Sequence, residues 1–424
     1  MDARVNPDVE ALTRLPWPKA GDATAVPYGV FTERAIYDLE QQRIYRGPTW
    51  NFLGLAAEVP NGGDFKATFI GDTPVVLVRD SDGSLHAWVN RCAHRGALVC
   101  RELRGNNSTG THTCVYHQWA YDNKGDLVGV PFRKGLAGKG GYPKDFDMKA
   151  HSLTKVRVED YHGVVFGTFD DQLQPVADYL GRDEPVDYHL KRIFNRPVEV
   201  LGHHRQFVPS NWKFYAENTK DPYHASLLHL FHMTFGLYRS SQEGGVRITN
   251  KWHTVLFSKA GTDSDDALNE TEDAKLRTYD SGYRLADMSL LAGRREFDDN
   301  VTLVIISLMP TLVIQQIQNT LAVRQILPKS ESEFELVWTY FGYTDDDEEL
   351  RNIRLKQANL IGPAGLISME DGESSVICQQ AVVRDQNEVS CIEMGGRNIE
   401  DHDHLVTETT IRAFWDQYRN LMGA

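Results

Sequence analysis

The chain has 424 residues, a formal net charge of −14 at pH 7 and five cysteines. This length exceeds one ordinary domain, so at least two domains are expected, and the acidic balance makes nucleic acid and anionic membranes poor partners. The charged N-terminus lacks an apolar core of signal-peptide length and no later segment is apolar enough to span a bilayer, so a cytoplasmic protein is expected. An odd cysteine count argues against a disulfide framework and for metal or redox use of some thiols.

The first third of the chain predicts short β-strands joined by tight turns. Residues 73–80 and 84–90 are apolar segments on either side of a Ser-Asp-Gly turn, so they predict a hairpin that leads directly into Cys92. Residues 119–131 repeat this arrangement around an Asn-Lys-Gly turn. A further apolar strand at 163–169 is expected to close the β unit.

Beyond about residue 170 the pattern changes to helices mixed with strands. Residues 210–236 have helical spacing, and residues 301–343 are rich in the apolar residues of β-strands. The acidic run 345–349 predicts the first turn of a helix, where carboxylates complement the helix dipole. A last helix is predicted over 407–422. The second domain is therefore predicted to be α+β.

Two Cys/His pairs lie at loops between predicted strands, Cys92 with His94 and Cys114 with His117. In this C-x-H…C-x-x-H order two thiolates can hold one iron and two imidazoles the other, which is the ligand set of a Rieske [2Fe–2S] centre. The neutral imidazoles raise the cluster potential to a range suited to accepting electrons. A structural Zn²⁺ site is the alternative, although zinc fingers group cysteines together and histidines together. The other cysteines are expected to be buried free thiols: Cys100, Cys378 and Cys391.

A second group of residues that can bind a metal follows in the α+β region. Its members are Glu217, Asp221, His224, His229 and His232. Two histidines and one carboxylate can hold Fe(II) on one side and leave positions open for O₂. His224 and His229 are five residues apart, about 140° on an ideal helix, so they converge only if the helix is distorted by π-type widening or by a bend near Pro222. His232 competes for the second position, and Asp221 is also explained as a helix N-cap.

Several segments resemble the large subunits of Rieske-type aromatic-ring-hydroxylating oxygenases. The two cluster boxes at 92–96 and 114–131 carry the resemblance, and it extends over most of the chain from about Val26. Further segments that resemble this family are ENTKDPYHASLLH, QQIQN, AVRQ, RLKQANLIGPAG and SMEDGE. A Rieske electron carrier, the alternative from another class, would need only the first third of the chain.

The resemblance implies an α+β protein with three parts. An N-terminal segment, residues 1–45, is expected to pack on the catalytic domain. An all-β Rieske [2Fe–2S] domain is expected over 46–170. A catalytic mononuclear iron domain is expected over 171–424, with an antiparallel sheet wrapped by helices in a helix-grip-like arrangement.

The resemblance also implies the iron ligands. The D-x-x-H-x-x-x-x-H box matches at His224 and His229, and Asp371 matches the family's aspartate as the third Fe²⁺ ligand. Glu370 and Glu373, which flank Asp371 in the SMEDGE segment, are the fallback candidates.

The aspartate that matches at Asp221 is implied to connect the cluster of one subunit to the iron of its neighbour. It would link the cluster ligand His117 to the iron ligand His224, and Asn218 is assigned to the same catalytic group. This route implies an α3 or α3β3 assembly in which a small β subunit accompanies the chain. Electrons are expected from NAD(P)H through a ferredoxin or a flavin reductase.

The substrate expectation rests on Arg324, which lies in the alternating segment LAVRQILP. A buried guanidinium can hold a carboxylate by two parallel hydrogen bonds, whereas spacing alone equally allows an arginine on a solvated face. The resemblance favours large subunits that oxidise aromatic carboxylates: terephthalate, anthranilate, ortho-halobenzoate and salicylate. Residues 402–406 lack the second arginine of the terephthalate pattern. The expected activity is thus dioxygenation of an ortho-substituted benzoate, with salicylate-type monohydroxylation or terephthalate 1,2-dioxygenation as alternatives.

Overall fold

The computed structural model describes residues 7–260 and 275–424 of the chain. The chain forms two compact units. The first, Tyr45–Val176, is all β, and the second joins the chain up to Ile44 to the chain from Ala177 onward. Among the described residues, no helix has the length and apolarity needed to cross a membrane.

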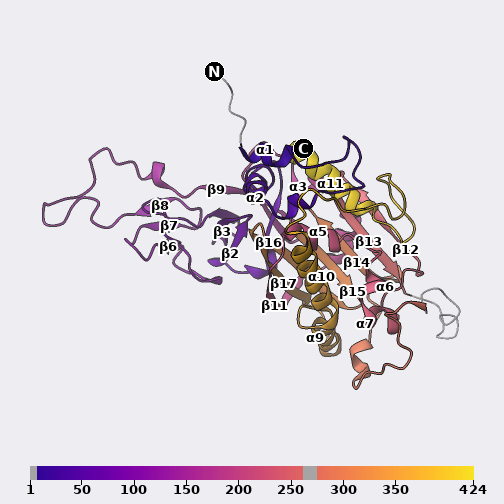
Figure 1. Cartoon of the computed structure of the whole chain (residues 1–424). Coiled ribbons are helices and arrows are strands. Elements are labelled where there is room, and N and C mark those ends of the chain that lie inside the picture. Colours follow the sequence, from indigo (N-terminus) through magenta and orange to yellow (C-terminus); the bar gives the residue numbers. More distant parts are fainter. Residues whose placement is uncertain (1–6, 261–274) are drawn as a thin grey trace. The chain divides into compact units, whose positions relative to one another are not determined.

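The first unit contains one large antiparallel sheet and one small one (Figure 1). The large sheet has the strand order β1-β10-β9-β4-β3-β2-β5, and the small sheet has the order β6-β7-β8. Its strands are β1 Asn51–Leu55, β2 Asp64–Ile70, β3 Thr73–Arg79, β4 Leu85–Val89, β5 Arg104–Asn106, β6 Thr111–Thr113, β7 Ala120–Asp122, β8 Leu127–Gly129, β9 Lys155–Tyr161 and β10 Val164–Thr168. Short 3₁₀ turns occur at η3 Ala56–Glu58 and η4 Lys149–His151.

The predicted hairpins of this unit are confirmed. β3 and β4 pair antiparallel around the predicted turn, and Gly83 adopts the positive φ of 87° that this turn requires. β7 and β8 form the second hairpin. Each hairpin therefore adjoins one Cys/His loop, as the sequence indicated.

The second unit is built on a seven-stranded antiparallel sheet with the order β11-β17-β16-β15-β14-β13-β12. Its strands are β11 Val198–Val208, β12 Gly244–Thr249, β13 His253–Lys259, β14 Val301–Leu308, β15 Leu312–Ile317, β16 Thr320–Ser330 and β17 Glu333–Tyr343. β15 is buried at every position and β14 at all but one. Because both faces of these strands are covered, apolar residues do not alternate strictly with polar ones, and the buried polar residues Gln315 and Gln316 lie within β15.

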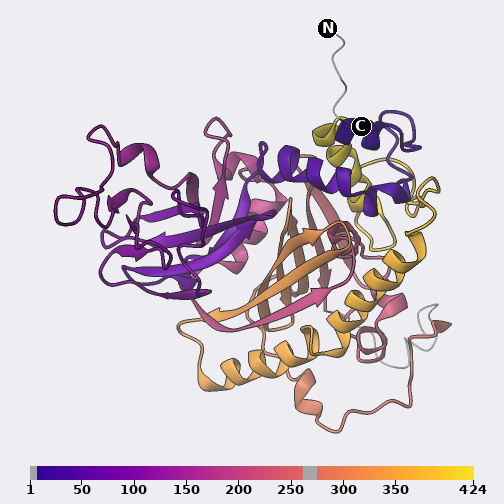
Figure 2. The same cartoon turned by 60° about the vertical axis from the view of Figure 1, so that its left-hand side comes forward.

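Helices surround this sheet, as Figure 2 shows for α9 and α10 along its orange strands. The helical segments are α1 Pro7–Thr13, η1 Tyr28–Phe31, α2 Arg34–Glu40, η2 Gln41–Tyr45, α3 Val176–Tyr179, α4 Pro185–Ile193, α5 Trp212–Asn218, α6 Ala225–Leu228, α7 Leu230–Thr234, η6 Met288–Leu291, α9 Glu348–Ile361, α10 Leu366–Val382 and α11 Thr409–Met422. α9 begins as predicted, because the Asp347 side chain accepts a hydrogen bond from the Leu350 N–H. The predicted α+β class and the antiparallel sheet with helices are confirmed.

The N-terminal segment is fixed to the second unit by one buried carboxylate. Glu40, at the end of α2, accepts hydrogen bonds from Trp212 Nε1 and Lys213 Nζ on α5 and from the Tyr418 hydroxyl on α11. Glu40 and Lys213 are both fully buried. The Glu40 carboxylate thus joins α2, α5 and α11, which are far apart in sequence. The N-terminal segment therefore forms part of the core of the second unit.

Candidate metal centres

The first Cys/His loop leaves β4 and is closed by the side chain of Asn90. The Asn90 carbonyl oxygen accepts hydrogen bonds from the N–H groups of Val99 and Cys100, both at 2.9 Å, and its amide donates to the Cys100 carbonyl at 2.7 Å. Inside the loop, Gly96 N–H donates to the Cys92 carbonyl. One asparagine thus holds both ends of the loop that carries Cys92 and His94.

The second loop joins β6 to β7 and turns back through Gln118, which has a positive φ of 55°. The Cys114 N–H donates to the Trp119 carbonyl, and Gln118 N–H donates to the Cys114 carbonyl, both at 2.9 Å. Burial raises the pKa of the Cys114 thiol, while N–H donors from Tyr116 and His117 act in the opposite direction. The loop therefore presents N–H groups to the sulfur, and these offset part of the effect of burial on its thiolate form.

The four predicted cluster ligands come together between these loops. Cys92 and Cys114 are buried, at 3% and 1% exposure, and the ring centroids of His94 and His117 lie 4.4 Å apart. The Nδ1 atoms of both histidines are buried and have no hydrogen-bond partner among the described residues. Two thiols and two unpartnered imidazole nitrogens at one place fit a [2Fe–2S] Rieske cluster, because each atom is a ligand that the cluster needs.

Two aromatic residues that the sequence analysis did not single out support this ligand set. Trp119 stacks on His94 with an interplanar angle of 6°. The Tyr121 hydroxyl lies 3.3 Å from Cys92 Sγ and accepts the Ala93 N–H at 3.1 Å. Both belong to the WAY segment that was assigned only to a strand, and their roles become visible once β7 is placed beside the first loop.

The remaining cysteines divide into two kinds. Cys100 is buried as predicted, its Sγ lies 3.3 Å from His112 Nδ1, and burial raises its pKa to about 12. Cys378 and Cys391 are free but exposed, so their predicted burial is wrong.

In the second unit, the structure brings together His224, His229 and Asp371. One ligand atom from each lies within 4.8 Å of the others. His224 Nε2 is 3.4 Å and His229 Nε2 is 3.2 Å from the same Asp371 oxygen. Two imidazoles and one carboxylate that converge in this way have the composition of a facial triad for Fe(II).

The helix between the two histidines is interrupted, so the predicted departure from regular α-geometry is confirmed. α6 ends at Leu228, His229 itself is extended with φ −91° and ψ 98°, and α7 begins at Leu230. No π-type widening separates the two histidines, and although the chain does bend over residues 222–224, the break between the two short helices lies at His229. Instead, the extended backbone of His229, between the two short helices, lets its ring approach that of His224.

Asp221 is not a helix N-cap, which corrects the structural alternative for this residue. α6 begins only at Ala225, and Asp221 Oδ1 accepts a hydrogen bond from the Tyr223 N–H at 2.8 Å in a local turn. Its other oxygen lies 3.2 Å from His224 Nδ1. The carboxylate therefore contacts the nitrogen of His224 that faces away from Asp371.

Each histidine of the triad has a carboxylate at its other nitrogen. Glu370 Oε2 lies 2.7 Å from His229 Nδ1, so this fallback candidate is a partner of His229 and lies outside the triad. Burial lowers the pKa of His224, but Asp221 and Asp371 outweigh it and raise the pKa to about 10. Burial likewise acts against ionisation of Asp371, and the two histidines hold its pKa well below the usual range.

Three further candidates lie near the triad in different roles. The Asn218 amide donates to Asp371 Oδ1 at 3.0 Å and lies 3.3 Å from His224 Nε2. Glu217 faces away, accepts a hydrogen bond from Trp415 Nε1, and its pKa is raised to about 8 by burial. Glu373 is exposed and is not part of the triad.

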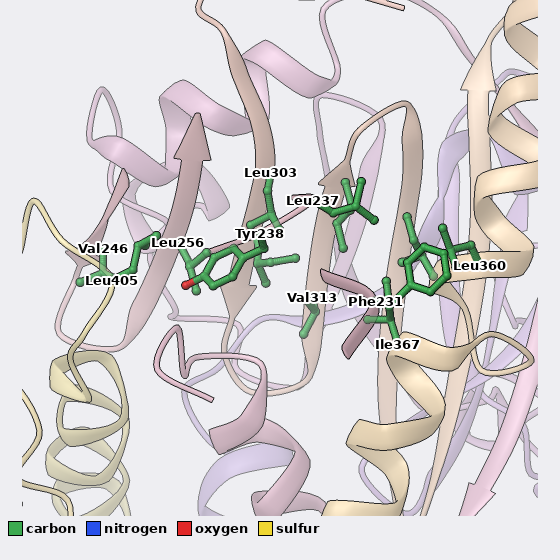
Figure 3. Packing of buried hydrophobic residues seen from close by; sticks show 13 residues of the cluster. Phe231, Leu237, Tyr238, Val246, Leu256, Leu303, Val313, Leu360, Ile367 and Leu405 are labelled. Atoms are coloured by element: carbon green, nitrogen blue, oxygen red, sulfur yellow. The ribbon is translucent and has the colours of Figure 1, made fainter. Parts of the chain in front are cut away.

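The triad opens into a cavity, here called the iron-site cavity, whose wall is mostly apolar. It is lined by Asn218, Thr219, Asp221, His224, Ala225, His229, His232, Tyr238, Leu256, Leu303, Ile305, Ile317, Arg324, Ile367 and Asp371. Figure 3 shows Tyr238, Leu256, Leu303 and Ile367 packed within one buried cluster. A second cavity of about 540 Å³ shares Asn218, Asp221 and His224 with it.

Arg324 lies in the wall of the iron-site cavity and is 6% exposed, so it is not on a solvated face. Its Nε donates to Gln315 at 2.6 Å and one terminal nitrogen donates to the Tyr215 hydroxyl at 3.0 Å. Among the described residues, no carboxylate forms an ion pair with this guanidinium. The sequence did not single out Gln315 or Tyr215, because only the strand register and the position of α5 bring them to Arg324.

A Rieske-type ligand set in one unit and a two-histidine, one-carboxylate site in the other define a Rieske non-haem iron oxygenase. Two families match the chain: "Rieske [2Fe-2S] domain" over residues 49–139 and "Ring hydroxylating alpha subunit (catalytic domain)" over residues 177–424. The chain belongs to the family of ring-hydroxylating oxygenase alpha subunits. Such chains carry a [2Fe–2S] cluster and a mononuclear non-haem iron, and the two donor sets described above fit both groups.

Curated relatives cover nearly the whole chain. It is 53% identical to the anthranilate 1,2-dioxygenase large subunit of Burkholderia cepacia, over 95% of this chain and 94% of that one. It is 49% identical to a terephthalate 1,2-dioxygenase alpha subunit of a Comamonas species, over 94% and 96%, and 41% identical to the salicylate 5-hydroxylase large component of a Ralstonia species, over 96% of each. The fold is that of naphthalene 1,2-dioxygenase from a Rhodococcus species, with a TM-score of 0.76 at 21% identity over 94% of both chains.

Proposed function

We propose that this chain is the large oxygenase subunit of a multicomponent enzyme that hydroxylates a benzoate with a small ortho substituent, such as anthranilate, salicylate or a 2-halobenzoate. The observation that carries the proposal is Arg324, a buried cation in the iron-site cavity without an acidic partner among the described residues. A buried charge is stable only when it is paired, so a carboxylate from the substrate is its natural counter-ion. The relatives named for anthranilate, terephthalate and salicylate support the same class.

The geometry around Arg324 supports recognition of a single carboxylate. Gln315 and Tyr215 hold the guanidinium through Nε and one terminal nitrogen, and Trp338 packs against its face, with the guanidinium carbon 4.6 Å from the ring centroid. The other terminal nitrogen keeps N–H groups that a carboxylate can accept. Arg324 is the sole arginine or lysine among the described residues that line this cavity. This favours a monocarboxylate over terephthalate, in agreement with the absence of an arginine at 402–406.

Both metal groups would be held by residues described above. Cys92, His94, Cys114 and His117 would hold the cluster in the 46–170 domain, and His224, His229 and Asp371 would hold Fe²⁺ in the 171–424 domain. With these groups bound, the cluster supplies electrons and the iron supplies O₂ activation. The apolar wall excludes water from the reacting ring, Arg324 orients the carboxylate, and Asn218 keeps the Asp371 oxygen in place.

Asp221 is proposed as the connection between subunits. Its carboxylate contacts His224 Nδ1, and Asp221 lines both the iron-site cavity and the second cavity. His117 of the partner subunit would approach Asp221 there, so that one carboxylate contacts a histidine of each centre. This arrangement implies an α3 or α3β3 assembly with a small β subunit. Electrons would come from NAD(P)H through a ferredoxin or flavin reductase in the cytoplasm.

The test supplies the protein with a reductase, NADH, ¹⁸O₂ and a panel of substituted benzoates, together with the matching toluenes. We expect carboxylated substrates to be turned over and the toluenes to be poor substrates. Two labelled oxygens in the product identify a dioxygenase, one identifies salicylate-type monohydroxylation, and preference for terephthalate identifies the third alternative. Equal turnover of benzoates and toluenes would contradict the carboxylate class.

A further inference from the structure

His232 is a polar side chain in the iron-site cavity that has no role in the triad. It lies on α7, three residues after His229, and their ring centroids are 5.2 Å apart. The residue is 4% exposed and lines the cavity, but the three converging ligand atoms come from other residues. Its predicted competition for the iron therefore finds no support in the geometry.

The His232 ring lacks a partner where one is needed. Its Nδ1 is buried and makes no hydrogen bond to any described residue. A buried polar atom left unpaired costs about 1–3 kcal/mol, and such atoms in a folded protein call for an explanation. Tyr238, the nearby phenol of the same wall, is different, because its hydroxyl donates to the Pro222 carbonyl at 2.8 Å.

The other residues that line the iron-site cavity indicate which kind of group can be the hydrogen-bond partner of His232. Around His232 the cavity is lined by aliphatic side chains, namely Leu256, Leu303, Ile305, Ile317 and Ile367. Two side chains in this wall can still form hydrogen bonds to a ligand, namely the guanidinium of Arg324 and the imidazole of His232. His232 lies on the short helix α7 that begins directly after the iron-site histidine His229, and the two rings are neighbours, whereas Arg324 comes from β16.

We propose that His232 recognises a hydrogen-bonding substituent, amino or hydroxyl, on the ring carbon next to the one that carries the carboxylate. This inference rests on the proposed function, because the carboxylate on Arg324 sets which ring carbons face the iron. A neutral imidazole has one nitrogen that accepts a hydrogen bond and one that donates. An amino or hydroxyl group can donate to an unprotonated ring nitrogen of His232 that faces the cavity, whereas hydrogen, methyl and halogen substituents cannot. The site thus selects anthranilate or salicylate over 2-halobenzoates.

The test measures equilibrium binding to the metal-loaded protein without O₂, by calorimetry. The ligands are benzoate and its 2-amino, 2-hydroxy, 2-methyl and 2-chloro derivatives, which differ mainly in hydrogen-bonding capacity. We expect the wild type to bind the amino and hydroxy compounds about 10-fold more tightly than the methyl and chloro compounds, since one hydrogen bond of about 1.4 kcal/mol gives this factor. Equal affinity for 2-aminobenzoate and 2-methylbenzoate would overturn the proposal without any variant.

Two variants of His232 then locate the preference. His232→Phe keeps an aromatic ring and removes the nitrogens, so the amino-to-methyl preference should disappear while benzoate affinity stays the same. His232→Gln retains a hydrogen-bonding group and should keep most of the preference. Iron content measured on each variant separates a lost hydrogen bond from a lost metal. A preference that survives in His232→Phe would assign it to another residue and overturn the proposal.

Failure of this inference can be told apart from failure of the proposed function. Arg324→Gln should weaken all five ligands by a similar factor and leave the amino-to-methyl ratio unchanged. If the wild type binds aniline and toluene as tightly as the corresponding benzoates, the proposed function fails. If carboxylated ligands are preferred but the ortho substituent has no influence, only the role of His232 fails.

Discussion

The Nδ1 atom of His229 lies 2.7 Å from a carboxylate oxygen of Glu370, the residue directly before Asp371 on α10. One helix therefore provides both a triad carboxylate and the partner that orients a triad histidine. A carboxylate at the outer nitrogen of a metal-binding histidine fixes its tautomer and increases its basicity. Glu370 is thus part of the site although its carboxylate is not one of the three converging ligand groups.

We expect Glu370→Gln to lower Fe²⁺ affinity by about 10- to 100-fold, because the neutral amide stabilises the required tautomer less well. Affinity is measured by competition with a chelator of known strength. Glu373→Gln is the matched control, since it removes an exposed carboxylate from the same helix. Equal iron retention in the two variants would contradict this role for Glu370.

Asp221→Asn tests the connection between subunits. We expect both metals to stay bound and steady-state product formation to fall at least 100-fold, because an amide cannot accept a proton or carry the charge of the carboxylate. Single-turnover experiments with a pre-reduced cluster should show a cluster that stays reduced in the presence of substrate and O₂. Normal cluster oxidation together with product formation would exclude the bridge.

The sequence predicted the chemistry of the site better than its geometry. The residues that converge, His224, His229 and Asp371, are those that the family resemblance indicated, because a ligand is specified by residue type and local spacing. The break at His229 could not be foreseen in its actual form, since neither glycine nor proline marks it. Tertiary packing of α6 and α7 overrides the helical propensity of this segment.

Contacts that depend on long-range topology could also not be predicted from the sequence. Gln315 reaches Arg324 through the β15–β16 register, and Tyr215 arrives from α5, 109 residues away. The solvated alternative for Arg324 could be rejected only when β16 was seen to be covered on both faces. Exposure of Cys378 and Cys391 was missed because cysteine is among the most frequently buried residue types.

Arg324→Gln should raise KM for carboxylated substrates about 30-fold or more. Loss of a charge-assisted contact in a buried site costs roughly 2 kcal/mol or more, and 2 kcal/mol corresponds to this factor. Turnover of an uncharged ring such as toluene should change little, which provides the internal control. An unchanged KM for benzoates would remove Arg324 from the carboxylate site.

Glu40→Ala should destabilise the second unit by about 3–5 kcal/mol, because it leaves the fully buried Lys213 ammonium without its counter-ion. Asp38→Ala on the same helix removes only an exposed ion pair with Arg34 and should cost less than about 0.5 kcal/mol. The free energy of unfolding is measured with denaturant on both variants. Similar values would show that the N-terminal segment does not depend on this pair.

Glu217→Gln should change the pH dependence of stability. Burial raises the pKa of Glu217 to about 8 from a model-peptide value of 4.5. The protonated carboxyl therefore favours the folded state, and this contribution is complete below about pH 4.5 and is lost as the pH rises toward 8.

The glutamine keeps a carbonyl acceptor for Trp415 Nε1 but cannot ionise in either state. The variant should thus match the wild type near pH 5 and exceed its free energy of unfolding by roughly 2 kcal/mol at pH 8, a value reduced by water in the adjoining cavity. Denaturant titrations at pH 5, 6.5 and 8 test this, with the exposed Glu373→Gln as control. Parallel curves for Glu217→Gln and the wild type would mean that Glu217 is already ionised in the folded protein.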